Sequence, residues 1–511
     1  MKVIDFEKRY YLYRLVLSFA SGVSLASAFA PANEPIYALA GLLIIFYLVG
    51  ITQKVKDAFL WGLAFGFGWF VVGVNWVYFS MYHYGYMPLE WTYVTTCVFA
   101  LGLGLFPAAA FAIATRLTEN AALRMAFTIP AAFTLTEWIR SWFLTGFPWL
   151  NPAYAVIDWP IAGIAPILGS FGVLLALTWI AGLLAAFWVL RGQWIYMGAC
   201  AIMAFSLLFL GMVGDRVPWS ESAGTLKVRL IQPNLEPRLL QQSMSERFDE
   251  VYFYLDNVSV EKPDIDLVIL PESVYPISVQ RMPQEMNRLT EWVKKEKKGL
   301  LFNAFWEPQA GDFRNAAIHL TPNGELSVYE KRHLVPFGEF VPWGFHRFVE
   351  SMRIPMSDLT AGADTQPLMN LSGHPASVNL CYENLFGNEW RDAWHEGSPE
   401  LLVNLSNLKW FGPYKAASQH LQISRMRDKE SARPLLNVTN SGVTALVDAR
   451  GQVLESLPSD ESALRDVTVV TAKGEATPYI RMGDWPALLW AFAMFVVGVA
   501  LSVFLKRRQN V

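Results

Sequence analysis

Three side chains in the second half of the chain are of the types that together perform covalent acyl chemistry. Glu272 follows the apolar run in DLVILPES, Cys381 follows that in SVNLCYEN, and Lys331 lies between them in YEKRHLVPFGEFVP. A carboxylate can remove a thiol proton, the thiolate can attack a carbonyl carbon, and a fixed cation with a backbone N–H can stabilise the resulting oxyanion. A nearby ammonium would also favour the thiolate at neutral pH. The residue types therefore point to covalent acyl chemistry, although spacing alone does not establish that they meet.

Strands that alternate with helices would position these residues. Short β-branched runs recur between turns, at 227–231, 267–270, 300–303, 316–320, 377–380, 401–404, 435–438 and 443–447. Helical stretches lie between some of them, at 244–259, 283–297 and 416–431. This alternation is typical of α/β folds with buried sheets, in which polar residues at strand ends commonly carry function. We therefore predict an α/β domain with Glu272, Cys381 and Asn404 at strand ends.

The charge distribution divides the chain into three regions. The chain has 511 residues, and its 41 basic and 44 acidic residues fall as 18 in residues 1–210, 62 in 211–480 and 5 in 481–511. The first region is too apolar for an ordinary soluble domain. The net charge of −3 argues against nucleic acid as a partner, because that binding needs a basic face. We predict a membrane region, a water-soluble domain and a short membrane tail.

Eight apolar stretches are long enough to cross a bilayer, which takes about 20 residues. They lie at 12–30, 35–51, 58–80, 92–114, 122–140, 165–190, 194–213 and 486–505. Lys and Arg gather at one set of span ends and are absent from the opposite connections 31–34 and 81–91, and basic loops stay cytoplasmic. The prediction is therefore a domain of seven transmembrane helices over 1–213, an external catalytic domain over 214–484, and a last transmembrane helix with a cytoplasmic tail over 485–511. Both termini are then cytoplasmic.

The first span also has features of a signal peptide, with small residues in the sequence from Ala26 to Ala30. We expect a retained anchor, because another span follows within five residues. The external domain implies an oxidising compartment, yet only Cys381 of the three cysteines lies in that domain. An unpaired thiol there is consistent with a reactive role.

Several blocks of the sequence resemble the nitrilase superfamily. VILPESVYP, YEKRHLVPFGE and NLCYEN follow the order of its Glu, Lys and Cys segments. With the seven-plus-one arrangement of spans and the blocks EWIRSWFLTGFPWL, HLQISRMRDKESARPLL and TNSGVTA, the whole chain is similar to the apolipoprotein N-acyltransferase family. The resemblance implies an αββα sandwich attached to the bacterial inner membrane, with the catalytic domain in the periplasm.

The resemblance implies Glu272 as general base, Lys331 as oxyanion stabiliser and Cys381 as nucleophile. The implied reaction moves a fatty acyl chain from a phospholipid, expected to be the sn-1 chain of phosphatidylethanolamine, through a cysteine thioester. The acceptor would be the N-terminal α-amine of an S-diacylglyceryl-cysteine apolipoprotein, in the last step of lipoprotein maturation. No cofactor or metal is expected. Supporting roles fall to Glu339, Glu383 and Tyr382.

One departure from the family pattern is visible. NLSNLKWFG has Leu408 and Lys409 where the family usually shows Asp and Ala, which puts in doubt any role for an acid in that loop. The aromatic residues Phe337, Phe340 and Trp343 follow the lysine, and they fit a buried core or a lid at the membrane interface equally well.

Other interpretations stay open. A membrane-tethered carbon–nitrogen hydrolase could use the same triad on a soluble amide, with water as acceptor, and an inactive transporter or scaffold is a third class. Glu339 and Glu383 could be ordinary ion-pair partners, and Asn404 could cap a strand end. His333 is expected on the opposite face from Lys331.

Two features of the spans invite predictions as well. Glu137 and Arg140 are spaced i, i+3 and are predicted to form an ion pair. Asn75 is predicted to lie inside the third span, where a polar side chain needs a hydrogen-bond partner.

Overall fold

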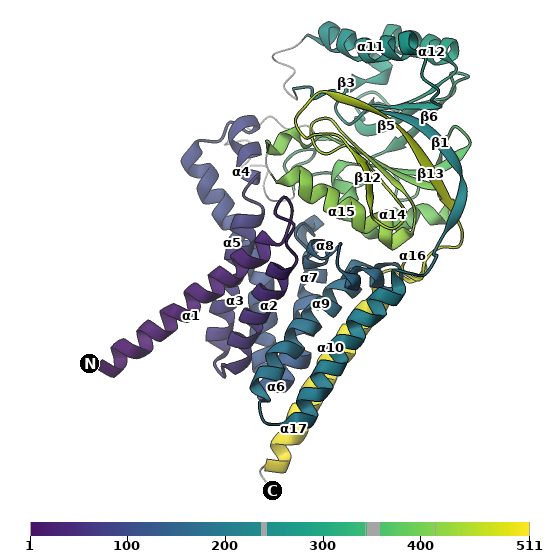
Figure 1. The fold of residues 1–511 in the computed structure, drawn as a ribbon. Helices are drawn as coiled ribbons and strands as arrows, with labels where there is room; N and C mark the ends of the chain where they lie inside the picture. Colours follow the sequence, from purple (N-terminus) through teal and green to yellow (C-terminus); the bar gives the residue numbers. More distant parts are fainter. Residues whose placement is uncertain (1, 237–242, 343, 345–357, 414, 510–511) are drawn as a thin grey trace. The chain divides into compact units, whose positions relative to one another are not determined.

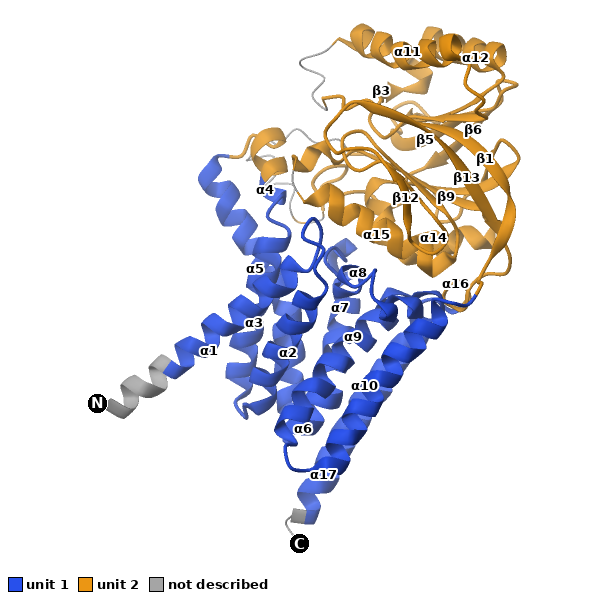
Figure 2. Ribbon diagram, in the orientation of Figure 1, with its two compact units in different colours: residues 1–78, 88–217, 482–511 blue, residues 79–87, 218–481 orange. Residues whose placement is uncertain are grey.

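The chain folds into two compact units. The structure, a computed structural model, describes residues 2–236, 243–342, 344, 358–413 and 415–509 (Figure 1). Residues 1–78, 88–217 and 482–511 form the first, called the helical unit, and residues 79–87 and 218–481 form the second, called the sheet unit (Figure 2). Trp343, a predicted lid residue, lies outside the described residues.

The helical unit consists of long apolar helices joined by short turns. Among the described residues, five helical stretches are long and apolar enough to cross a membrane: Val55–Gly73, Leu89–Leu117, Pro160–Val189, Trp194–Gly214 and Trp485–Arg508. They comprise α3, α5, α9 (Ala165–Val189) with η4 (Pro160–Ile164) before it, α10, and α17 (Trp485–Gln509). The other predicted spans are helical too, as α1 (Lys2–Ser27), the shorter apolar α2 (Ile36–Ile51), and the run α6 (Ala121–Leu123), η2 (Arg124–Thr128) and α7 (Ile129–Arg140). The apolar helical region is thus confirmed, whereas the number of eight spans remains a prediction.

Small residues allow the helices of this unit to pack closely. A Cβ added to Gly66 on α3 would lie 2.5 Å from the Cα of Gly104 on α5, so the two backbones touch where neither residue has a side chain. Close backbone approach of this kind is a main source of helix association in apolar surroundings. The predicted pair on α7 is confirmed, since Arg140 Nη2 lies 2.5 Å from Glu137 Oε2 and both side chains are buried.

The third predicted span was drawn too long. Helix α3 ends at Gly73, and residues 74–76 form a bend and turn before the short α4 (Val77–Phe79). Asn75 is exposed in this turn and its carbonyl accepts the N–H of Tyr78, so the prediction that it lies inside the third helix is wrong. The apolar residues after the turn extend the hydropathy signal, which reports preference for burial and not continuity of a helix.

The sheet unit is an αββα sandwich. One sheet has the order β13-β1-β2-β4-β5-β6, with β3 also paired to β4, and the other has the order β12-β11-β10-β9-β8-β7. The strands of the first are β1 (Glu221–Gln232), β2 (Leu267–Ile269), β3 (Tyr275–Ser278), β4 (Gly299–Trp306), β5 (Arg314–Leu320), β6 (Leu326–Glu330) and β13 (Ala463–Lys473). Those of the second are β7 (Met369–Leu371), β8 (His374–Leu380), β9 (Leu401–Ser406), β10 (Leu435–Thr439), β11 (Ala445–Val447) and β12 (Val453–Ser456).

Two apolar cores hold the sandwich together. The inner core lies between the sheets and includes Leu230 and Ile269 from one sheet and Leu380 and Val403 from the other, all almost fully buried. The outer core joins the first sheet to α11 (Met244–Glu261) and α12 (Pro283–Glu296). Helices α14 (Gly387–Asp392) and α15 (Ala416–Ser431) lie on the second sheet (Figure 1). Because β8, β9 and β10 are parallel and covered on both faces, nearly all of their residues are buried, including Asn379, Asn404 and Asn437.

A short piece of chain from between two long helices belongs to the sheet unit. Residues 79–87 include the π-helical turn η1 (Ser80–Tyr84), which packs against η9 (Leu408–Phe411). Residues 79–87 therefore contact the loop that follows β9.

Candidate active site

The predicted site residues lie where strands of the two sheets end. Glu272 follows β2 and Lys331 follows β6 in the first sheet, and Cys381 follows β8 in the second. Cys381 has a φ of 49°, in the left-handed region that costs a residue with a side chain about 1–3 kcal/mol. Cys381 opens the 3₁₀ turn η7 (Cys381–Leu385), so the sharp turn away from β8 is made at the nucleophile itself.

Lys331 is buried between two carboxylates. Its Nζ lies 2.9 Å from Oε1 of Glu339 and 3.6 Å from Oε1 of Glu272, and its side chain is only 1% exposed. The amide of Asn315 on β5 donates to both carboxylates, at 2.8 Å to Glu339 and 3.0 Å to Glu272. The second oxygen of Glu339 accepts the Val335 N–H at 2.8 Å. The lysine and both acids are therefore fixed by hydrogen bonds from several elements.

Burial and charge shift the pKa values of this cluster. Burial alone would lower the pKa of Lys331, but the carboxylates of Glu339 and Glu272 outweigh it and the pKa is raised. Burial raises the pKa of Glu272, a change that Lys331 opposes. The ammonium is thus firmly charged, while the desolvated carboxyl of Glu272 is a better proton acceptor than a solvated one.

The predicted effect of the lysine on the thiol is present, but it is not the largest effect on the pKa of Cys381. Lys331 does lower the pKa of Cys381, as expected, but burial and the negative charge of Glu272 outweigh it, and the pKa is raised well above its usual value. The shift favours the thiol over the thiolate, so a base that removes the proton would assist attack by the sulfur.

Glu383 holds the turn that carries Cys381. One of its oxygens accepts the Leu380 N–H at 2.7 Å, and the other accepts the Tyr329 hydroxyl at 3.0 Å and the Arg332 N–H at 2.6 Å. Burial, with the nearby Glu389, raises the pKa of Glu383 to about 7. Its contacts run to the backbone on both sides of the site, so its predicted support of the site is positional.

Two aromatic residues near the site contact the ring of Phe386. Tyr382 is buried beside the ring of Phe386. His333 stacks on the same ring at 3.9 Å, and its Nδ1 lies 2.6 Å from Glu389. The histidine is thus held by Phe386 and Glu389 in the segment after β6, which is not a strand, so strand periodicity does not decide where it points.

Sequence reasoning missed three polar residues around the site. The backbone N–H of Asn407 donates to Oε2 of Glu272 at 2.9 Å and also faces the Cys381 thiol, and Asn315 bridges the acids. His420 on α15 lies 3.4 Å from the Cys381 carbonyl through Nε2, and burial lowers its pKa to about 4. Asn404, which drew notice as a strand-end residue, instead donates to Asn379 on the neighbouring strand. The repeated Asn of NLSN was the available signal for Asn407.

The described lid candidates form a tight turn. The Phe337 N–H donates to the Phe340 carbonyl at 2.9 Å, and Phe337 has a φ of 61°. Phe337 is 42% exposed and Phe340 is half-buried. An exposed phenyl ring next to the loop that carries Glu339 suits contact with an apolar molecule.

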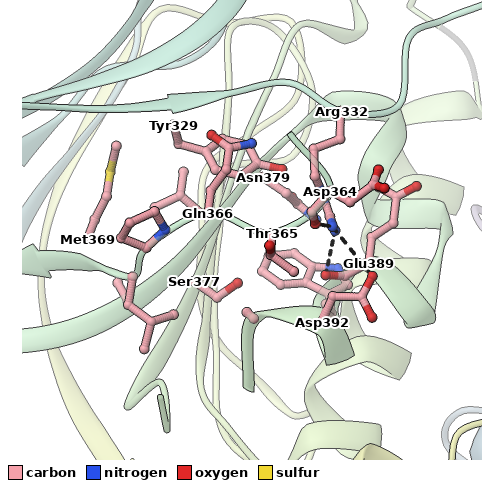
Figure 3. Close-up of a pocket in the computed structure, with 16 residues that line it drawn as sticks. Tyr329, Arg332, Asp364, Thr365, Gln366, Met369, Ser377, Asn379, Glu389 and Asp392 are labelled. Atoms are coloured by element: carbon pink, nitrogen blue, oxygen red, sulfur yellow. Dashed lines mark hydrogen bonds and ion pairs between the residues drawn. The ribbon is translucent and has the colours of Figure 1, made fainter. Parts of the chain in front are cut away.

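A small pocket lies next to this site, with a cavity volume of about 30 Å³ (Figure 3). It is lined by Tyr329, Arg332 and side chains from 364–369, 376–379 and 389–393, and none of the three predicted catalytic residues lines it. Within the described chain, Arg332 Nε and Asn379 Nδ2 are buried without a hydrogen-bond partner. A space of this size suits an ordered water molecule, and the predicted catalytic residues lie outside it. In the part of the chain that the structure describes, no group of three or more His, Cys, Asp or Glu side chains could hold a metal ion.

Known proteins share both regions of the sequence. Residues 21–183 match the apolipoprotein N-acyltransferase N-terminal domain, and residues 229–479 match the carbon-nitrogen hydrolase family. An apolipoprotein N-acyltransferase from Ralstonia nicotianae is 37% identical over 91% of this chain and 89% of its own, and one from Methylococcus capsulatus is 34% identical over 97% of each chain.

Solved structures that resemble the chain cover about half of it. A carbon-nitrogen hydrolase from Helicobacter pylori is 15% identical over 48% of this chain and 89% of its own, with a TM-score of 0.38. An amidase from Nesterenkonia sp. is 16% identical over 52% of this chain and 96% of its own, also with a TM-score of 0.38.

The sheet unit is thus a domain of the carbon–nitrogen hydrolase class, with a Glu, a Lys and a Cys gathered at the ends of its strands, in a chain that is also a membrane protein. The chain belongs to the apolipoprotein N-acyltransferase family, and it is an acyltransferase.

Proposed function

We propose that this protein transfers a fatty acyl chain from a phospholipid to the N-terminal α-amine of an S-diacylglyceryl-cysteine apolipoprotein. The observation that carries the proposal is the buried contact of Lys331 with Glu272 beside the Cys381 thiol. The expected donor is the sn-1 chain of phosphatidylethanolamine, and the product completes lipoprotein maturation.

In the first half-reaction, Glu272 takes the thiol proton as the Cys381 sulfur attacks the ester carbonyl carbon. The Lys331 ammonium stabilises the tetrahedral oxyanion. When the intermediate collapses, the carbon–oxygen bond breaks, and the lysophospholipid alkoxide takes the proton from Glu272. An acyl thioester on Cys381 remains.

In the second half-reaction, the neutral α-amine of the apolipoprotein attacks the thioester carbonyl. Glu272 accepts a proton from the amine and returns it to the departing Cys381 sulfur. The products are an amide and the free thiol, so atoms and charges balance and the enzyme returns to its starting state. Two products that leave in turn predict ping-pong kinetics.

Supporting roles follow from the contacts of each residue. Glu339 would hold Lys331 in place, Glu383 would hold the turn at the nucleophile, and Tyr382 would lie next to the acyl group. The exposed Phe337, with Phe340 behind it in the same turn, would touch the acyl chain as it enters.

A lipid donor explains why the enzyme needs apolar helices. Moving an acyl chain into water costs about 0.8 kcal/mol for each CH₂ group, so the reaction is best performed at a membrane surface. We propose eight transmembrane helices, seven in a membrane domain over 1–213 and one in 485–511, with the catalytic domain 214–484 in the periplasm. The protein would lie in the bacterial inner membrane with both termini in the cytoplasm and its first span retained. The basic residues at one set of span ends support this orientation.

Intact-mass measurement of the purified full chain with phospholipid tests the proposal. We expect added mass equal to one fatty acyl group, absent from Cys381→Ala, and discharged by a diacylated lipopeptide with a free α-amine. The same lipopeptide with an acetylated amine is the control and should leave the thioester intact. If water discharges the acyl group as fast as the lipopeptide does, the chain acts as a hydrolase and the transferase proposal fails.

A further inference from the structure

The 79–87 connection packs on the loop 407–412, which follows β9 (Figure 2). Ser80 Oγ donates to the Trp410 carbonyl at 2.5 Å, and the rings of Tyr84 and Trp410 meet edge to face at 4.7 Å. The Tyr84 hydroxyl lies 3.2 Å from Oε1 of Glu236 and 3.5 Å from the Lys409 carbonyl. Polar and aromatic contacts therefore fix one side of this loop.

The fit between the two segments is close. Gly412 has a φ of 71°, and a Cβ there would lie 2.8 Å from the ring of Phe79. Glycine is required at this position for both its backbone conformation and the approach of the phenyl ring.

Lys409 fixes the same loop from another direction. Its ammonium donates to Oδ1 of Asn234 at 2.8 Å, and Asn234 lies just beyond the end of β1. This hydrogen bond gives the loop a second anchor.

The loop begins at the residue that contacts the predicted base. Asn407 is fully buried, and its backbone N–H donates to Oε2 of Glu272 at 2.9 Å. Its side-chain oxygen accepts the Lys409 N–H at 3.2 Å and the Asn440 amide at 3.1 Å. A shift of residues 408–410 would therefore move the N–H that orients the base.

We propose that Tyr84 and Lys409 are positioning residues, which hold the Asn407 N–H on the Glu272 carboxylate from outside the reacting cluster. The connection between α3 and α5 is then part of the active site. The proposal rests on the proposed function in one respect, the role of Glu272 as base. The Asn407 N–H lowers the pKa of both Glu272 and Cys381, against the larger effect of burial, so losing its alignment changes when the thiol ionises. Besides Glu272, the charged groups that act on the thiol are Lys331 and Glu339.

The test compares Tyr84→Phe and Lys409→Met with the control Tyr82→Phe in the full-length protein. Tyr82 lies on the same turn and is 41% exposed, so its hydroxyl offers a matched deletion. The first readout is the rate of Cys381 alkylation by iodoacetamide against pH, which needs no lipid substrate. The second is kcat and KM for acyl transfer.

We expect the alkylation profile of both variants to move to higher pH, with kcat about 5–10-fold lower, the effect of one lost hydrogen bond to a charged group, and KM unchanged. The control should match the wild-type protein. Unchanged alkylation profiles overturn the proposal. A uniform loss of alkylation rate at every pH, together with a lower melting temperature, also overturns it, because a purely structural contact would give that result. If the profiles shift but phospholipid never acylates Cys381, the proposed function fails and the positioning role stands.

Discussion

Replacing Lys331 with methionine should separate the charge of this side chain from its bulk. The ammonium lies 2.9 Å from Glu339 and 3.6 Å from Glu272. At an effective dielectric constant of about 20, Coulomb's law gives on the order of 5 kcal/mol of gross attraction for each contact. Without it, two buried carboxyl groups face each other, and the pKa of Glu272, which Lys331 now lowers, must rise further. Glu272 would then hold its proton to higher pH and would accept one from the thiol less readily.

Two effects of Lys331→Met act on the rate together. Loss of one oxyanion donor typically costs about 10²–10³ in kcat, and loss of the base costs more. We expect thioester formation to be at least about 10³-fold slower, measured by intact mass after rapid mixing with phospholipid. The melting temperature should fall as well, because a buried charge pair has lost one partner.

A second substitution provides the control. Lys331→Met with Glu339→Gln restores the net charge of the cluster, and it should recover much of the melting temperature while leaving thioester formation slow. If Lys331→Met alone forms the thioester at the wild-type rate, the assignment of Lys331 as oxyanion stabiliser is wrong. If the double variant regains activity, the lysine acts only by neutralising Glu339.

Three further substitutions test other parts of the structure. The pKa of Glu383 is raised to about 7 in the folded state. Between its ordinary carboxyl pKa and this value, the folded state binds a proton that the unfolded state releases. The group therefore stabilises the fold at low pH, and this contribution is lost as pH rises through about 7. Thermal unfolding of wild-type protein and Glu383→Gln across this range should show that difference, and parallel curves would contradict it. Glu137→Leu leaves the buried Arg140 unpaired and should destabilise the helical unit by about 3–5 kcal/mol in denaturant unfolding, whereas Glu137→Leu with Arg140→Met should cost less. Gly412→Ala should lower the rate of acyl transfer more than Gly311→Ala does. Both glycines have positive φ, but only a Cβ at 412 would contact a ring, that of Phe79. Equal losses of rate would show that backbone strain alone matters.

The sequence pointed to the proposed reacting groups more clearly than to the residues that contact them. Glu272, Lys331 and Cys381 stand in recognisable blocks at the ends of apolar strands. Asn315 and Asn407 reach the same cluster from β5 and from the loop after β9, and pairings across such distances leave no local pattern. The rise in the pKa of Cys381 could not be predicted, because burial is a property of the folded site, whereas one lysine is easily seen in a sequence.

The prediction of strands from the sequence was limited as well. The eight predicted strands are buried runs and all appear in the sheets, whereas β12 is exposed along its whole length and β13 alternates exposed and buried residues at the sheet edge. Exposed edge strands carry charged residues that suppress the apolar signal. The end of α3 at Gly73 escaped prediction for the opposite reason, since apolar residues continue past the turn.

The origin of the reacting groups in two different sheets has a consequence for tolerance to mutation. Glu272 and Lys331 stand on one sheet, and Cys381 on the other, so the thickness of the apolar layer between the sheets sets how far the sulfur lies from its base. Shrinking Leu380 or Val403 in this layer should slow the reaction beyond what the loss of stability explains. A similar substitution at Leu255 on α11 or Leu289 on α12, in the outer core, should lower the stability of the fold. It should leave the turnover rate of the folded fraction unchanged.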